Sequence, residues 1–80
     1  MKKVEEKLIE IIANDRLGKK VRIFVFPSET ILNLKRLIAA KIGVKAERIR
    51  LQKSNIVYKD HIRLVDYDVA NGMSFEMYYG

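Results

Sequence analysis

The stretch PSETILNLKRLIAAKIG, residues 27–43, brings together a proline, a capping hydroxyl and an apolar helical pattern. Pro27 cannot donate to a sheet, so a strand that precedes it ends there. Thr30 suits an N-cap, because its hydroxyl can accept a hydrogen bond from an amide of the first helical turn. Gly43 supplies a stop, since glycine readily adopts the left-handed conformation that ends many helices. The sequence therefore predicts a helix between Thr30 and Gly43.

The predicted helix has one apolar side. Its stripe consists of residues three or four positions apart: Ile31, Leu34, Ile38 and Ile42. We expect Leu37 to widen this stripe. The basic residues Lys35, Arg36 and Lys41 are expected on the opposite face. This pattern is typical of a helix that packs one side against a core.

Two alternating segments precede the helix and predict a hairpin. Residues 8–13 and 21–26 are rich in β-branched and aromatic side chains. The polar residues between them include Gly18, which can adopt a positive φ at the turn. The side chains expected to face inward are those at alternate positions: Ile9, Ile11, Ala13, Val21, Ile23 and Val25.

The segments after the helix predict three further strands. Residues 48–53 alternate as a strand, and residues 56–58 form a short partner beyond a turn at Ser54-Asn55. Residues 64–67 indicate a tight helical turn. Asn71-Gly72 marks the bend into a strand over residues 74–79, on which Phe75 and Met77 point the same way. The order β-β-α-β-β-β predicts an α+β domain, with one helix packed across one face of a mixed sheet.

Length and composition indicate a single small domain. Eighty residues fit one core. We assign residues 8–80 to the domain and residues 1–7 to a flexible leader or an expression remnant. The chain has no cysteine, which favours an intracellular setting. No apolar run approaches the roughly 20 residues of a membrane span.

The sequence contains no motif that supports catalysis, metal binding or nucleotide binding. His61 is the only histidine, and its neighbour Asp60 points elsewhere, so we interpret it as a loop residue. One histidine and scattered carboxylates give no metal-ligand spacing. The glycine-rich phosphate-binding patterns do not occur. We expect no enzyme activity, no cofactor and no metal.

The net charge of +6 raises the question of nucleic acid. The basic residues are spread along the chain, apart from a local concentration over residues 45–53, and this favours a solvated surface. Phe24 and Phe26 lie on the outward face of their predicted strand. We interpret them first as a partner-binding surface and second as stacking groups for RNA. Direct RNA binding is not our expectation.

Several motifs resemble ubiquitin. Residues 27–31 (PSETI), Leu34-Lys35 and Gly43 resemble its passage from strand to helix, and residues 64–69 (LVDYDV) resemble its Leu-x-Asp-Tyr-x-Ile turn. Together with Gly18, the resemblance covers residues 8–79 at nearly constant spacing. It implies the β-grasp fold, in which the first and last strands lie parallel at the centre of the sheet.

A narrower resemblance points to the Hub family of ubiquitin-like proteins, also called the ubiquitin-like protein five or beacon family. The motifs that show this resemblance are residues 14–22 (NDRLGKKVR), residues 37–40 (LIAA), residues 59–61 (KDH) and the terminal Tyr78-Tyr79. Ubiquitin conjugation needs an extended tail ending in Gly-Gly that threads narrow enzyme channels. The Hub family instead ends in Tyr-Tyr-x and is regarded as binding non-covalently. We therefore expect Gly80 to be a strand end and not a reactive tail.

The resemblance also implies partners. Ubiquitin receptors dock on an apolar patch, whereas the matching positions here are Arg16, Gln52 and Tyr78. Burying these groups unpaired would cost about 1–3 kcal/mol each, so such receptors should reject this face. The Hub family implies two other partners: a short helical element in a tri-snRNP splicing protein and a DEAD-box splicing helicase.

Glu29 stands at the position where the family has an acidic residue that pairs with an arginine of the helical element. Its alternative role is a carboxylate at the helix start, worth roughly 0.3–1 kcal/mol through the helix dipole. We take Glu29, Arg22, Phe24 and Phe26 as the candidate partner-binding residues.

The resulting hypothesis is a monomeric, non-covalent, ubiquitin-like modulator of pre-mRNA splicing in the nucleus and cytoplasm. Two alternatives stay open: a covalent ubiquitin-like modifier and a small basic RNA-binding domain. We expect no membrane association.

Overall fold

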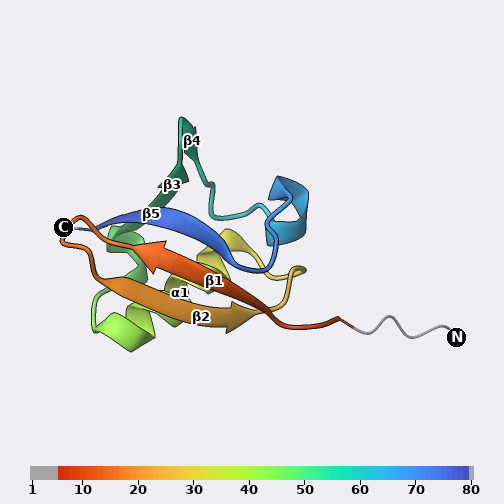
Figure 1. The fold of residues 1–80 in the computed structure, drawn as a ribbon, viewed down its shortest axis with the longest axis horizontal. Coiled ribbons are helices and arrows are strands. Elements are labelled where there is room, and N and C mark those ends of the chain that lie inside the picture. Colours follow the sequence, from red (N-terminus) through yellow and green to blue (C-terminus); the bar gives the residue numbers. More distant parts are fainter. Residues whose placement is uncertain (1–5, 80) are drawn as a thin grey trace, which may run out of the picture.

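The computed structural model describes residues 6–79, so the predictions for residues 1–5 and for Gly80 lie outside the described part. Eight elements follow one another along the chain (Figure 1): β1 (Ile9–Asn14), β2 (Lys20–Val25), α1 (Ile31–Ile42), η1 (Ala46–Arg48), β3 (Ile49–Lys53), β4 (Ile56–Val57), η2 (Leu64–Tyr67) and β5 (Met73–Tyr79). The predicted order of strands and helix is confirmed. The 3₁₀ turn η1 was not predicted.

The hairpin between β1 and β2 is held by its turn. The strands pair antiparallel from Ile9↔Val25 to Asn14↔Lys20. Gly18 has φ +86°, a conformation that L side chains rarely adopt. Asp15 Oδ1 accepts hydrogen bonds from the Leu17 amide at 2.9 Å and the Lys19 amide at 2.8 Å. These bonds satisfy turn amides that the strand ladder does not pair.

Both predicted ends of α1 are confirmed. Thr30 Oγ1 accepts a hydrogen bond from the Asn33 amide at 3.2 Å. Gly43 lies in the left-handed region with φ 80°, and its amide donates to the Ala39 carbonyl at 2.8 Å. The helix is therefore capped at both ends by the two residues predicted to cap it, Thr30 and Gly43.

Two side chains of α1 lie where the pattern did not place them. Lys35 is only 8% exposed, and its Nζ lies 2.6 Å from Asp60 Oδ1, so its assignment to the solvent face is wrong. Leu37 is 38% exposed and does not widen the core stripe. The cause is helical geometry. At about 100° per residue, Lys35 lies about 40° from Ile31 around the axis, and Leu37 about 120° from it.

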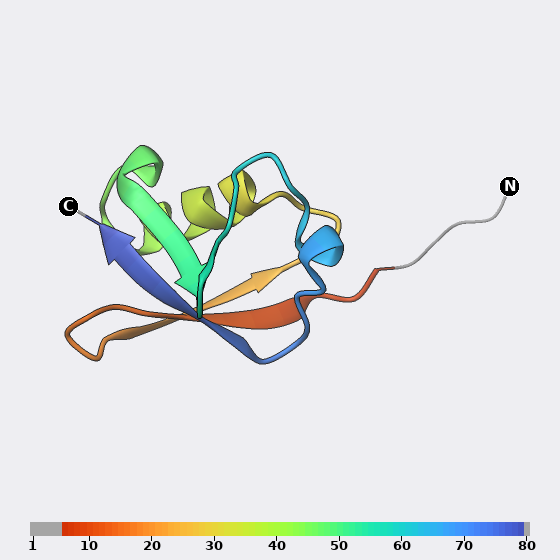
Figure 2. The same ribbon diagram turned by 90° about the horizontal axis from the view of Figure 1, so that it is seen from above.

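The five strands form one mixed sheet in the order β2-β1-β5-β3-β4. At its centre β1 runs parallel to β5, from Ile11↔Met73 to Asn14↔Glu76, while the other neighbouring pairs are antiparallel. Figure 2 shows α1 on one side of the sheet; within residues 6–79 no other helix of its length covers the opposite side. This is the predicted ubiquitin-like arrangement.

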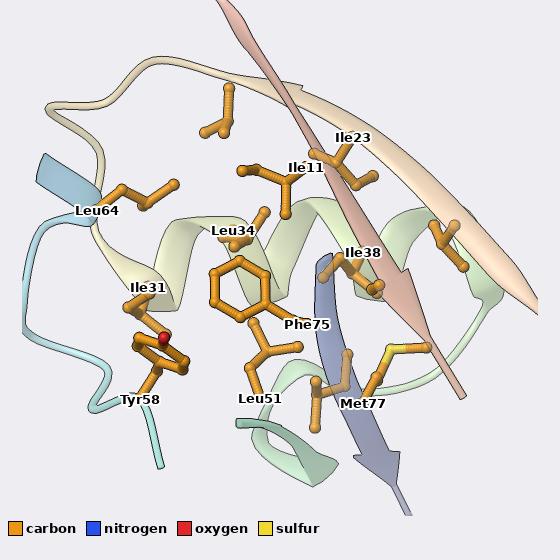
Figure 3. Close-up of a cluster of buried hydrophobic side chains, with 14 of the residues drawn as sticks. Ile11, Ile23, Ile31, Leu34, Ile38, Leu51, Tyr58, Leu64, Phe75 and Met77 are labelled. Atoms are coloured by element: carbon orange, nitrogen blue, oxygen red, sulfur yellow. The ribbon is translucent and has the colours of Figure 1, made fainter. Parts of the chain in front are cut away.

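The core lies between α1 and the sheet (Figure 3). Leu34 and Ile38 point from the helix toward Ile11, Phe75 and Met77, and all five are at most 1% exposed. Burying each such side chain contributes about 1.5–3 kcal/mol.

Aromatic rings close one end of the core. The Tyr58 ring packs edge-on against Phe75 and Tyr67, with centroids 4.8 and 4.6 Å away. Burial raises the pKa of the Tyr58 hydroxyl, with a smaller contribution from Tyr67. The buried phenol therefore ionises less readily than an exposed one.

Candidate protein-binding surface

The loop between β2 and α1, here called the β2–α1 corner (residues 26–30), is fixed by the Glu29 side chain. Glu29 Oε2 accepts a hydrogen bond from the Phe26 amide at 2.8 Å, and Oε1 accepts one from Asn33 Nδ2. The Glu29 amide donates to the Phe26 carbonyl at 3.0 Å. The Glu29 carbonyl accepts from the Leu64 amide at 2.9 Å. These bonds join Glu29 to the Phe26 amide and to the Asn33 side chain. The helix-dipole role and the partner role of this carboxylate both stay predictions.

A second carboxylate reaches the same corner. Glu6 accepts two hydrogen bonds from Ser28, one from the amide at 3.0 Å and one from the hydroxyl at 2.7 Å. The sequence offered no sign of this contact, because the two residues are 22 positions apart. It ties the segment before β1 to the residue next to Glu29.

Apolar side chains are exposed beside this corner. Phe24, on the outward face of β2, is 62% exposed, and Phe26 just beyond the strand is also exposed. Leu8 is exposed as well; Leu8 and Phe26 are the residues next to the terminal pair Ile9↔Val25. Leu8 was not predicted as a binding residue. Its place next to the terminal pair of the hairpin, on the same side as Phe26 in sequence register, could have indicated it.

Arg22 lies farther along β2. Its Nη1 is 3.4 Å from Glu10 Oε2 on β1, and its own carbonyl accepts a hydrogen bond from Lys41 Nζ at 2.9 Å. Four residues of strand, about 13 Å, separate it from Phe26. The structure therefore joins the Phe26 amide to the Glu29 carboxylate and leaves the Phe24 side chain exposed two residues earlier on β2. Arg22 lies two residues farther back along the same strand.

The sheet face that corresponds to the receptor-binding face of ubiquitin is polar here. Gln52 and Tyr78 are half-buried in β3 and β5, and Arg16 is exposed in the β1–β2 turn. Tyr78 pairs in register with Arg50, whose guanidinium carbon lies 5.3 Å from the centre of the Tyr78 ring. The Tyr78 hydroxyl donates to Glu76 Oε1 at 3.3 Å.

Metal sites, the single histidine and membrane-spanning helices were also considered in the sequence. Within residues 6–79, no group of three or more His, Asp or Glu side chains is placed to hold a metal ion. His61 is exposed in the segment between β4 and η2. No helix of the described part is long and apolar enough to cross a membrane.

The comparisons agree with this fold. The family model described as "Ubiquitin family" matches residues 12–79. A protein of Drosophila melanogaster named "Ubiquitin-like protein 5" is 54% identical over 72 residues, which make up 90% of this chain and 99% of that protein. "Ubiquitin-like modifier HUB1" of Debaryomyces hansenii is 53% identical and that of Schizosaccharomyces pombe 50%, with the same coverage.

The chain belongs to the Hub family of ubiquitin-like proteins. A solved structure adds support for the fold alone: the UBL domain of Plasmodium falciparum Dsk2, at a TM-score of 0.85 and 24% identity, covers 92% of this chain and 100% of that domain. The matching Hub relatives carry names of ubiquitin-like proteins and modifiers, not of enzymes.

Proposed function

We propose that this Hub-type chain is a ubiquitin-like modulator of pre-mRNA splicing that acts by non-covalent binding in the nucleus and cytoplasm. Its partners are a short helical element of a tri-snRNP splicing protein and a DEAD-box splicing helicase. The β2–α1 corner receives the helical element: Glu29 pairs with an arginine, and Phe24 and Phe26 cover an apolar side of the helix. The resemblance to the Hub family supports these partners.

The observation that carries the proposal is the fixed carboxylate of Glu29. A carboxylate offers about four acceptor positions, and the Phe26 amide and Asn33 occupy two of them. The remaining positions can accept a guanidinium. Because the side chain is already held in one orientation, an incoming arginine does not need to order it.

The exposed phenylalanines supply the second element of the surface. An amphipathic helix binds by laying its apolar side on an exposed apolar surface, read through residues three and four positions apart. Phe24 and Phe26 are exposed apolar side chains, and the amide of Phe26 is bonded to the Glu29 carboxylate. The energetically dominant residues of interfaces are enriched in Trp, Tyr and Arg, and in the proposed interface the partner helix supplies the arginine.

The non-covalent mode is supported by the resemblance to the Hub family, and the pairing of the last described residues agrees with it. Tyr78 and Tyr79 are strand residues, paired with Arg50 and Ile49 of β3. The Tyr79 hydroxyl also donates to Asp15 Oδ2 at 3.3 Å. In ubiquitin, conjugation uses an extended segment with little side-chain bulk beyond the last strand. Tyr78 and Tyr79 are bulky and paired in the sheet, so neither residue can belong to such a segment.

The deciding experiment titrates an arginine-containing helical peptide from a tri-snRNP protein against Glu29→Gln. Glutamine retains an acceptor for the Phe26 amide but loses the charge, so the corner should stay folded while the affinity falls by about 10- to 1000-fold. Replacing Glu29 with arginine and the peptide arginine with glutamate should recover part of the binding.

The matched control is Glu47→Gln, which removes one negative charge from the exposed turn η1. Its peptide affinity should equal that of the unmodified chain within about 2-fold. Equal affinities for the Glu29→Gln and Glu47→Gln chains would remove Glu29 from the interface. The melting temperature of each variant, measured alongside, separates loss of binding from loss of fold.

A separate measurement tests the non-covalent mode. The chain is incubated with ATP and cell lysate, and slower-migrating species sensitive to hydroxylamine or reductant are sought by immunoblotting. We expect none. A ladder of covalent adducts would establish the covalent alternative.

A further inference from the structure

An open hollow of about 340 Å³ lies at the end of the sheet remote from the β2–α1 corner, and we call it the arginine–tyrosine hollow. Its lining residues are Arg16, Arg48, Arg50, Tyr78 and Tyr79. Three of the five are cationic and two are aromatic. Within residues 6–79 no carboxylate lines the hollow itself, and the two nearby carboxylates, Glu76 and Asp15, accept hydrogen bonds from the Tyr78 and Tyr79 hydroxyls at 3.3 Å.

The three arginines come from separate parts of the chain. Arg16 lies in the turn between β1 and β2, Arg48 ends η1, and Arg50 lies on the outward face of β3. They converge because β5 lies between β1 and β3 in the sheet. The last residue of β5, Tyr79, reaches the β1–β2 turn through the hydrogen bond from its hydroxyl to Asp15 Oδ2 at 3.3 Å. The sequence, in which the basic residues are dispersed, does not reveal this cluster.

The two tyrosines are held in different ways. The Arg50 guanidinium lies over the Tyr78 ring, at 5.3 Å from its centre. The Tyr79 hydroxyl donates to Asp15 Oδ2 at 3.3 Å, and Asp15 is itself fixed by turn amides. Tyr79 is nevertheless 42% exposed, and it also lines two neighbouring hollows. A ring that is fixed but accessible costs little further ordering when a planar group stacks on it.

We propose that the arginine–tyrosine hollow binds single-stranded nucleic acid. The phosphates lie on Arg16 and Arg50, and a base stacks on Tyr79. Guanidinium groups match phosphate oxygens with paired hydrogen bonds, and aromatic rings give stacking that tolerates any base. This function goes beyond the protein-binding role proposed above and uses the opposite end of the sheet.

The chemistry of the hollow favours a nucleic acid strand over an acidic peptide. An acidic peptide supplies carboxylates for the arginines but no flat ring for Tyr79. A single strand supplies both phosphates and unstacked bases in alternation. The net charge of +6 adds attraction for a long polyanion, which an isolated small anion does not exploit.

The test measures fluorescence anisotropy of a labelled oligouridylate, about 12 nucleotides long, with the full chain at about 50 mM salt. We expect Arg16→Gln combined with Arg50→Gln to lower the affinity about 10-fold or more. The slope of log affinity against log salt should become shallower by about 1.4, since each lost phosphate contact accounts for about 0.7 on single strands.

The matched control is Arg36→Gln combined with Arg63→Gln. It removes the same charge from the middle of α1 and from the residue before η2, and neither residue lines the hollow. Its affinity should stay within about 2-fold of the unmodified chain. Equal losses in the two double variants would show attraction to overall charge only and would overturn the proposal.

Substitutions at Tyr79 test the stacking separately. Tyr79→Phe keeps the ring and should retain most of the affinity, whereas Tyr79→Ala should lose about 5- to 150-fold. Equal affinity of the two Tyr79 variants would overturn the stacking role. Binding of a glutamate oligomer as tight as that of oligouridylate would reassign the hollow to acidic peptides. No binding of oligouridylate up to about 100 μM chain would also overturn the proposal.

Discussion

The ion pair between Lys35 and Asp60 joins α1 to the segment that leads from β4 to η2. Lys35 Nζ lies 2.6 Å from Asp60 Oδ1, and the side chains are 10% and 51% exposed. The pair is therefore unequal: the lysine is buried, while the aspartate retains contact with solvent. A charge left without its partner is costly only where solvent cannot replace that partner.

This inequality predicts unequal costs. Asp60→Asn leaves a buried ammonium without a counterion and should lower the free energy of unfolding by about 1–3 kcal/mol. Lys35→Met keeps the aliphatic stem packed and leaves a solvated carboxylate, so we expect a change below about 1 kcal/mol. Urea denaturation of the two variants compares them. A loss for Lys35→Met as large as that for Asp60→Asn would contradict this inequality, because the variant keeps the aliphatic stem and removes only the ammonium and its bond to Asp60.

Asp15 makes the stability of the hairpin depend on pH in the acidic range. Hydrogen bonds from the Lys19 amide, and then from the Leu17 amide and the Tyr79 hydroxyl, hold the pKa of its carboxyl below the usual 3.8. The folded state thus favours the charged form. Its contribution to stability is full above the unfolded pKa and is lost as the pH falls through the folded pKa.

Asp15→Asn should therefore flatten the acid limb of the stability curve. We expect the urea midpoint of the unmodified chain to fall more steeply from about pH 5 to pH 2 than that of the variant. Glu47→Gln, on the exposed turn η1, serves as the control and should follow the unmodified chain. Parallel curves for the Asp15→Asn variant and the unmodified chain would show that the turn amides do not favour the carboxylate.

At the scale of elements, α1 offers two neighbouring residues with opposite environments. Ile38 is fully buried against the sheet, whereas Leu37 is 38% exposed. Ile38→Ala should lower the free energy of unfolding by about 2–5 kcal/mol, because it leaves a cavity between α1 and β5. Leu37→Ala should cost less than about 1 kcal/mol. Denaturation midpoints of the two variants report the rotation of the helix, and similar losses would contradict the register described here.

The elements could be predicted from the sequence because their signals are local. Thr30 and Gly43 mark the ends of α1 through the chemistry of single residues, and alternation in β1, β2 and β5 assigns the faces correctly. Lys35 was misplaced because its charge was given more weight than its angular position near Ile31. The Lys35–Asp60 pair depends on residues 25 positions apart, and no local pattern carries that information.

One of the two candidate surfaces could be predicted from the sequence, and the other could not. Glu29, Phe24 and Phe26 were found because a loop carboxylate and outward aromatic residues are visible in the alternation. Whether Glu29 meets a partner arginine stays a prediction. The arginine–tyrosine hollow was not anticipated, since Arg16 and Arg50 approach one another only through the parallel pairing of β1 with β5. Charge counted along the chain cannot show where charge gathers in space.

At the scale of the whole molecule, the two proposed surfaces lie at opposite ends of one sheet. The β2–α1 corner follows the end of β2, whereas the arginine–tyrosine hollow lies beside the β1–β2 turn and the end of β5 (Figure 1). The six paired positions between β1 and β2 span the distance between them, which corresponds to about 17 Å of extended strand. Exposed charges at such separations are largely screened, since the Debye length is about 8 Å at physiological ionic strength.

Two ligands influence each other only through an element that each of them shifts between two arrangements. The strands between these surfaces are continuously paired, and their inward side chains belong to one packed core. We therefore predict that the chain binds a helical peptide and an oligouridylate together and independently. Saturation with either ligand should change the affinity for the other by less than about 2-fold, as measured by anisotropy of the labelled oligouridylate and calorimetry of the peptide. The Arg16→Gln, Arg50→Gln double variant should bind the peptide as the unmodified chain does, and Glu29→Gln should bind oligouridylate normally. A coupling of about 10-fold would show that the sheet transmits a change between its ends, or that the two ligands share a surface.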